Sequence, residues 1–124
     1  MKKWIISACL LMMQAGAWAK VTLPDIMSDN MVLQQQTEAC LWGKANANAE
    51  VTIRPSWNRE TYKVTAGADG KWIAKIKTPT ASYNAYTISI SDGEEIILNN
   101  VLVGEVWFCS GQSNMEMPLR GFWN

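Results

Sequence analysis

The residues most able to do chemistry gather near the carboxy terminus, in the run GEVWFCSGQSNMEMPL (residues 104–119). Ser113 lies there between two amides, Gln112 and Asn114, two residues after Gly111. A serine on a sharp turn after a strand can attack an ester carbonyl, and its own N–H can stabilise the oxyanion that forms. Glycine lets the backbone turn sharply. The pattern makes Ser113 a candidate nucleophile for acyl transfer.

Two features count against this interpretation when the local sequence is taken alone. The common nucleophile elbow has glycine two residues after the serine, where this chain has Met115. The chain also has no histidine, although a serine hydroxyl needs a base within hydrogen-bond reach. Lysine is an alternative base, but no lysine follows Lys77. The ordinary alternative is a loop serine that caps a helix beginning near Asn114.

The element expected to position Ser113 is a buried strand. The run EVWFC (residues 105–109) is almost continuously apolar, as in a strand covered on both faces of a parallel α/β sheet. We therefore expect residues 104–124 to contain the first strand and the nucleophile loop of an α/β domain.

The preceding residues, 20–103, have a different pattern. Short runs with an apolar period of two alternate with polar turns about every ten residues, which is typical of an all-β sandwich or barrel. Asp69-Gly70 and Asp92-Gly93 are tight-turn signals between such runs. We predict a β-sandwich accessory domain over residues 20–103, with these strand-forming runs: MVLQQ, EACLWGKA, AEVTIRPSW, ETYKVTAGA, KWIAKIKT, AYTISIS and EEIILNNVLVG.

Three tryptophans of this region, Trp42, Trp57 and Trp72, are candidates for a sugar-binding face, because aromatic rings stack on sugars. A tryptophan on a sandwich strand more often fills the core. Trp57 lies in the polar run PSWNRE, and we expect it to be the most exposed of the three.

The composition limits the classes of function. The chain has 124 residues, of which 48% are hydrophobic and 18% are charged, and this suffices for one small globular domain. Basic and acidic residues number 11 each without a basic stripe, so we expect no nucleic-acid partner. Because the sequence has neither a metal-ligand cluster nor a phosphate-binding glycine loop, we expect no metal and no organic cofactor.

The first residues, 1–19, resemble a secretory signal peptide. A basic start (MKK) precedes an apolar stretch too short to span a bilayer, and Ala17 and Ala19 are spaced for signal peptidase. We expect cleavage, export to the periplasm or the outside, and no membrane span. ISAC, ending at Cys9, resembles a lipoprotein box, but it comes too early to follow a proper apolar region.

Cleavage would change the charge and the cysteine content. Loss of Lys2 and Lys3 from the 11 basic residues leaves 9 against 11 acidic residues, a net charge of −2. Cys40 and Cys109 would remain. In an exported protein they either form a disulfide or act as two small buried hydrophobes.

GEVWFCSGQSNMEMPL resembles the nucleophile block of the sialate O-acetylesterase family, a group of SGNH-type hydrolases. MSDNMVLQQ, LWGKA, ADGKW and NNVLVGEVW resemble, in order, landmarks of that family's amino-terminal β-sandwich, so the likeness covers nearly all of the mature chain. It implies that Ser113 attacks an acetyl ester and that its N–H donates to the oxyanion. Gly111 would permit close approach, and Gln112 and Asn114 would shape the site.

The same resemblance implies what the chain lacks. The family's late Asp-x-x-His pair matches no position here, so we expect a fragment that ends after the nucleophile and is inactive and aggregation-prone on its own. The expected substrate of the intact enzyme is an O-acetylated sugar, sialic acid in particular. Two alternatives stay open: an esterase for acetylated plant glycans, and a secreted carbohydrate-binding β-sandwich without catalysis.

Overall fold

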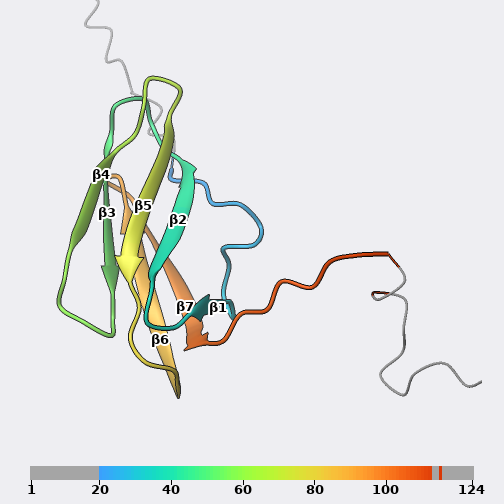
Figure 1. The fold of residues 1–124 in the computed structure, drawn as a ribbon. Helices are drawn as coiled ribbons and strands as arrows, with labels where there is room; N and C mark the ends of the chain where they lie inside the picture. The colour runs from blue at the N-terminus through green and yellow to red at the C-terminus, as the bar shows by residue number, and fades with distance from the viewer. Residues whose placement is uncertain (1–19, 113–114, 116–124) are drawn as a thin grey trace, which may run out of the picture.

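The computed structural model describes residues 20–112 and Met115. The expected signal peptide (residues 1–19), Ser113 and Asn114 lie outside the described residues. The described residues form seven strands (Figure 1), and each overlaps one of the seven runs identified from alternation. Six of them lie within their runs, whereas the strand that ends at Ser91 begins at Ser82, before the run AYTISIS (residues 85–91). They are β1 (Val32–Gln34), β2 (Glu38–Lys44), β3 (Glu50–Pro55), β4 (Tyr62–Thr65), β5 (Lys71–Lys77), β6 (Ser82–Ser91) and β7 (Glu95–Gly104).

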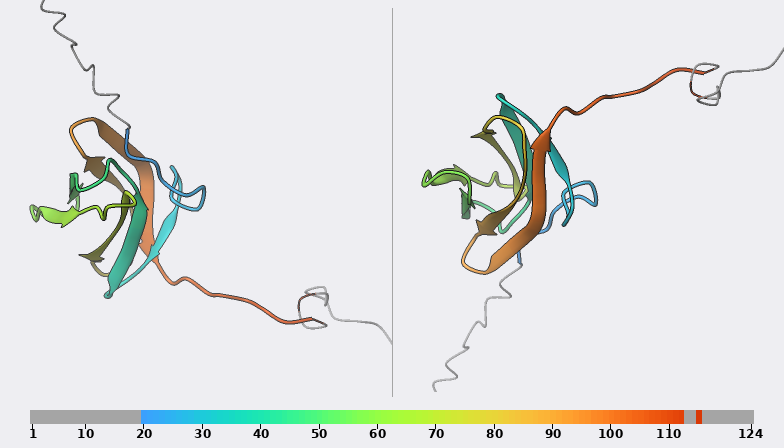
Figure 2. Two further views of the ribbon diagram at one scale, coloured as in Figure 1. Left: turned by 90° about the horizontal axis from the view of Figure 1, so that it is seen from above. Right: turned by 90° about the horizontal axis from the view of Figure 1, so that it is seen from below.

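The strands form two sheets. One has five strands in the order β1-β7-β6-β3-β4, and the other is the β2–β5 pair. All neighbouring strands are antiparallel except β1 and β7, which are parallel. The larger sheet curls, and β2 and β5 lie across its concave side (Figures 1 and 2). The expectation of an all-β architecture is thus confirmed for the residues that the structure describes.

The core lies between the two sheets and follows from alternation along the strands. In β5 the side chains of Trp72, Ala74 and Ile76 are buried, whereas the residues between them are exposed. Successive side chains of a strand point to opposite faces, so this period of two gives the strand one buried face and one exposed face. The other strands add to one continuous cluster that includes Leu41, Val51, Ile53, Ile88, Ile90, Leu98 and Val101.

Both Asp-Gly sequences lie in turns, but one turn connects two strands of the same sheet and the other connects strands of different sheets. Asp92-Gly93 connects β6 to β7 in an antiparallel hairpin, in which Ser91 is opposite Glu95. Asp69-Gly70 connects β4 to β5, which belong to different sheets. There the Asp69 carboxylate accepts a hydrogen bond from the Lys71 backbone N–H at 3.1 Å.

The strand expected at residues 105–109 is not formed. This segment is irregular and exposed, and no described strand pairs with it. A strand is stabilised by hydrogen bonds to a neighbour, so an apolar run without one has no sheet to join.

Two side-chain expectations are also corrected. Cys40 and Cys109 are free and exposed, so they are neither bonded to each other nor buried. Trp57 is half-buried rather than the most exposed tryptophan. Its indole N–H donates to the Lys77 carbonyl at 2.9 Å, and its ring packs edge to face on Tyr86 with centroids 5.5 Å apart. Of Trp42, Trp57 and Trp72, Trp42 is the most exposed.

Candidate functional site

The segment that leads to the candidate nucleophile is described up to Gln112. Gly111 has φ +135°, a value that favours glycine, and it is exposed, with no atom within 4 Å of where a Cβ would lie. The Gln112 carbonyl accepts a hydrogen bond from the Met115 N–H at 3.0 Å. Ser113 and Asn114 themselves lie outside the described residues.

The start of this segment is held where β7 ends. The parallel strand β1 lies beside β7, and the Gln35 N–H donates to the Gly104 carbonyl at 2.8 Å. The next residue, Glu105, accepts hydrogen bonds from the side-chain amides of Gln34 at 2.9 Å and Gln35 at 2.5 Å. We call Gln34, Gln35 and Glu105 the glutamine clamp.

The clamp also engages the backbone on both sides. The Gln34 side-chain oxygen accepts from the Val106 N–H at 2.8 Å, and the Gln35 side-chain oxygen accepts from the Ala81 N–H at 2.8 Å. Each amide therefore uses its donor for Glu105 and its acceptor for the main chain. The chain leaves the β domain at the end of β7, directly beside the clamp (Figure 1).

The electrostatics of the clamp favour a charged Glu105. Hydrogen bonds from Gln34, and to a lesser degree from Gln35, lower the pKa of the Glu105 carboxyl, while partial desolvation acts in the opposite direction. Donors that point at a carboxylate stabilise its ionised form.

Beyond the clamp, the chain presents apolar side chains to solvent. Trp107 is 83% exposed and Phe108 is 93% exposed, and Val106 beside them is also exposed. A contiguous apolar segment of this kind is typical of a surface that another structure covers.

The described residues do not supply the rest of a serine hydrolase site. The sequence has no histidine, and residues 20–112 with Met115 contain no group of three side chains suited to a metal. In the same part of the chain, no helix has the length and apolar character needed to cross a membrane. This region contains an anchored segment that is described as far as Gln112, the residue before Ser113 in the sequence.

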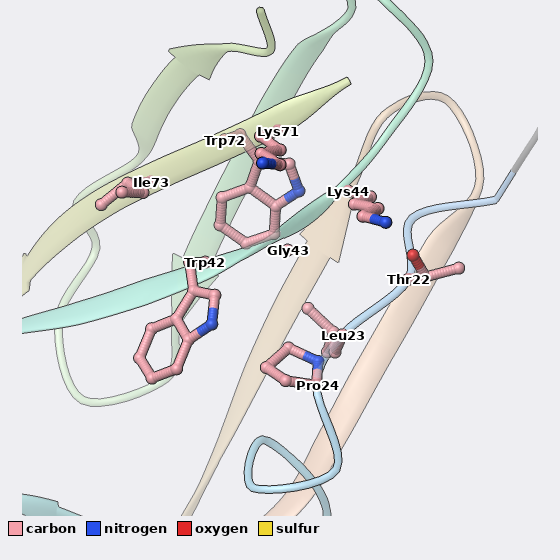
Figure 3. A pocket seen from close by; sticks show the side chains of 9 residues that line it. All are labelled: Thr22, Leu23, Pro24, Trp42, Gly43, Lys44, Lys71, Trp72 and Ile73. Carbon is pink, nitrogen blue, oxygen red and sulfur yellow. The ribbon is translucent and has the colours of Figure 1, made fainter. Parts of the chain in front are cut away.

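A second candidate site is a groove of about 420 Å³ at the edge of the β2–β5 sheet (Figure 3). We call it the Trp42 groove. The amino-terminal segment pairs with β2 at Thr22 and Lys44, through backbone hydrogen bonds of 2.8 and 2.9 Å. The next hydrogen-bonded pair in this register would join residues 24 and 42. Pro24 has no N–H to donate, so the segment leaves β2 there and opens the groove.

The walls of the Trp42 groove are aromatic and aliphatic, with lysines at one end. It is lined by Thr22, Leu23, Pro24, Trp42, Gly43, Lys44, Lys71, Trp72 and Ile73. Close packing at its floor requires Gly43, because a Cβ there would lie 2.4 Å from the Thr22 carbonyl oxygen.

Sequence reasoning missed both the clamp and the groove. In the sequence, the glutamines of the clamp are only part of a polar QQQ run. Their contact with Glu105 joins residues about 70 positions apart. Trp42 was a candidate sugar-binding residue, but no pattern in its local sequence indicated that Pro24 lies beside it in the groove.

Comparison with known proteins gives the class. No family model matches the chain. The crystal structure of a novel carbohydrate acetylesterase from Xanthomonas citri superposes with a TM-score of 0.69 and 34% identity, over 80% of this chain and 22% of that one. The described fold is thus shared with part of a carbohydrate esterase.

The curated relatives give the family. The chain is 30% identical over 118 residues to the sialate O-acetylesterase of Rattus norvegicus, which covers 88% of this chain and 22% of the relative. It is 32% identical over 108 residues to that of Pongo abelii, covering 79% and 20%. The chain is similar to sialate O-acetylesterases over most of its own length, which supports this family for it, and it spans about a fifth of the length of these relatives.

Proposed function

We propose that this chain forms the β domain and the nucleophile segment of an enzyme that removes O-acetyl groups from a sugar, with sialic acid as the favoured substrate. The observation that carries the proposal is the likeness to sialate O-acetylesterases over 88% of the chain. The GQSNM run supports Ser113 as the nucleophile, and the positive φ of Gly111 supports a tight turn just before it.

In the proposed reaction, the Ser113 hydroxyl oxygen attacks the acetyl carbonyl carbon while a base takes the hydroxyl proton. The tetrahedral oxyanion is held by N–H donors, the Ser113 N–H among them. The bond to the sugar oxygen then breaks, and that oxygen takes a proton. Water attacks the acetyl-serine, and acetate leaves. We propose that the base comes from residues beyond these 124, because the chain has no histidine.

Within this proposal, the described residues position the nucleophile and do not take its proton. The glutamine clamp holds the start of the nucleophile segment through four side-chain hydrogen bonds, two to Glu105 and two to the main chain. Fixed positioning of a nucleophile is a substantial source of rate enhancement. Within this proposal, the exposed Trp107 and Phe108 pack against the remaining part of the hydrolase domain.

The test uses the longer protein that we propose carries this chain. Ser113→Ala is expected to abolish acetate release from O-acetylated sialic acid, by about a thousandfold or more. Ser110→Ala is the matched control, because it removes a hydroxyl from an exposed neighbour, and it should retain activity. Unchanged hydrolysis in Ser113→Ala would exclude Ser113 as nucleophile.

The same assay separates the substrates. Acetylated xylan should release acetate much more slowly than O-acetylated sialic acid. Faster release from xylan would favour the alternative, a plant-glycan esterase, and this alternative is consistent with the broader class of the Xanthomonas citri neighbour. Absence of release from every acetylated sugar would favour the non-catalytic binding domain.

A further inference from the structure

The Trp42 groove has a floor and walls suited to the apolar face of a sugar ring. Trp42 is 42% exposed, and its cross-strand partner Ile73 is 66% exposed. Pro24 and Leu23 form the facing side (Figure 3). A half-exposed indole presents a flat face on which the C–H groups of a pyranose can stack, as aromatic faces do with flat or cationic partners elsewhere.

The charged side chains around the groove favour an anionic ligand. On the outer face of the β2–β5 sheet, Lys44 and Lys71 are directly opposite each other at the end of the groove. Lys75 and Lys77 continue along the same face, and Glu38 is its one acidic strand residue. The Lys71 ammonium meets Asp69 only at 3.8 Å in an exposed pair, which contributes little. This face is therefore locally basic on a chain whose basic and acidic residues balance.

We propose that the Trp42 groove binds an acidic sugar. The pyranose ring stacks on Trp42, and its carboxylate pairs with Lys44 and Lys71. An ammonium is a strong point donor to a carboxylate, and two of them at one end fix the orientation of the ring. Binding at this groove requires neither Ser113 nor ester hydrolysis, so it is measured without turnover.

The test titrates the full chain, labelled with ¹⁵N, with glucuronic acid and N-acetylneuraminic acid, and with glucose and N-acetylglucosamine as neutral controls. Both acidic sugars should bind with a Kd on the order of 1 mM and shift the indole N–H signal of Trp42. The neutral sugars should bind at least about threefold more weakly, and added salt should reduce only the affinity for the acidic sugars.

Matched variants assign the binding to the groove. Trp42→Ala should reduce the affinity for both acidic sugars about tenfold, whereas Tyr83→Ala, which removes a fully exposed aromatic ring from β6, should not. The double variant Lys44→Gln/Lys71→Gln should abolish the preference for acidic over neutral sugars, and Lys63→Gln on β4 should preserve it. A native-like NMR spectrum of each variant confirms that it folds.

Three results would overturn the proposal. The first is that neither acidic sugar binds the wild-type chain. The second is that acidic and neutral sugars bind equally well. The third is an affinity for acidic sugars that survives Trp42→Ala, since this would place the binding elsewhere.

Discussion

At the scale of the residue, Gly43 governs how closely the amino-terminal segment approaches β2. A Cβ at this position would lie 2.4 Å from the Thr22 carbonyl oxygen and 3.1 Å from Cζ2 of the buried Trp72. A backbone oxygen cannot rotate away as a side-chain end can. The hydrogen bonds between Thr22 and Lys44 would have to lengthen to admit even a methyl group.

We therefore predict that Gly43→Ala lowers the free energy of unfolding by about 1–3 kcal/mol, the usual cost of overpacking. Urea denaturation of the full chain measures this. Gly104→Ala is the control, because the nearest atom to its Cβ would be the Val32 methyl at 4.0 Å, and its effect should be much smaller. Equal stability of Gly43→Ala and wild type would show that the segment does not pack on β2 as described.

The tryptophans show when the burial of a single side chain can be predicted from the sequence. Trp57 was expected to be exposed because its sequence neighbours are polar, yet its indole finds the Lys77 carbonyl and Tyr86 from other strands. Trp72 lies inside because β5 alternates strictly. Burial was thus predictable where it follows from the period of a strand, and not where it depends on contacts made at a distance.

At the scale of the element, the glutamine clamp joins the β domain to the segment that precedes Ser113. The lowered pKa of Glu105 has a defined consequence for pH dependence. Because the folded pKa lies below the usual value of 4.5, the stability contributed by the clamp is complete above that value. It is lost as the pH falls through the lowered pKa.

We predict that the Val106 amide signal titrates with a midpoint below 4.5, because Val106 donates to Gln34, which in turn donates to Glu105. NMR spectra recorded across the acid range measure this. In Glu105→Gln the titration should disappear, while the Ala81 amide stays bonded to Gln35. A midpoint at or above 4.5 would mean that the amides do not hold the carboxylate in solution.

Elements were the most predictable level of this structure. Each of the seven strands overlaps a run identified from its alternation, because a period of two is a local property. Only β6 extends beyond its run, since it begins at Ser82. The pairing of strands is not local, so the sequence did not predict the parallel contact of β1 with β7 or the separate β2–β5 sheet. For the same reason EVWFC was wrongly assigned to a strand, since its apolar residues need a neighbour that the described chain does not supply.

At the scale of the whole molecule, the exposed segment after the clamp should control association. Trp107 and Phe108 present large apolar surfaces that water solvates poorly. We predict that the 124-residue chain self-associates at micromolar concentration and that Trp107→Ser/Phe108→Ser shifts it towards monomer. Sedimentation velocity measures this. Tyr83→Ser, at an isolated and fully exposed ring, should leave the association unchanged. A wild-type chain that is monomeric throughout would contradict the prediction.

The central claim is that Ser113 is the nucleophile of a carbohydrate O-acetylesterase that this chain helps to form. The most direct test is to treat the longer, active protein with a fluorophosphonate, which modifies activated serines covalently, and to locate the adduct by mass spectrometry. We predict one adduct, on the peptide that contains Ser113, and loss of acetate release in parallel with labelling. An adduct on another serine that accompanies the loss of activity, or full activity after Ser113 is modified, would contradict this account.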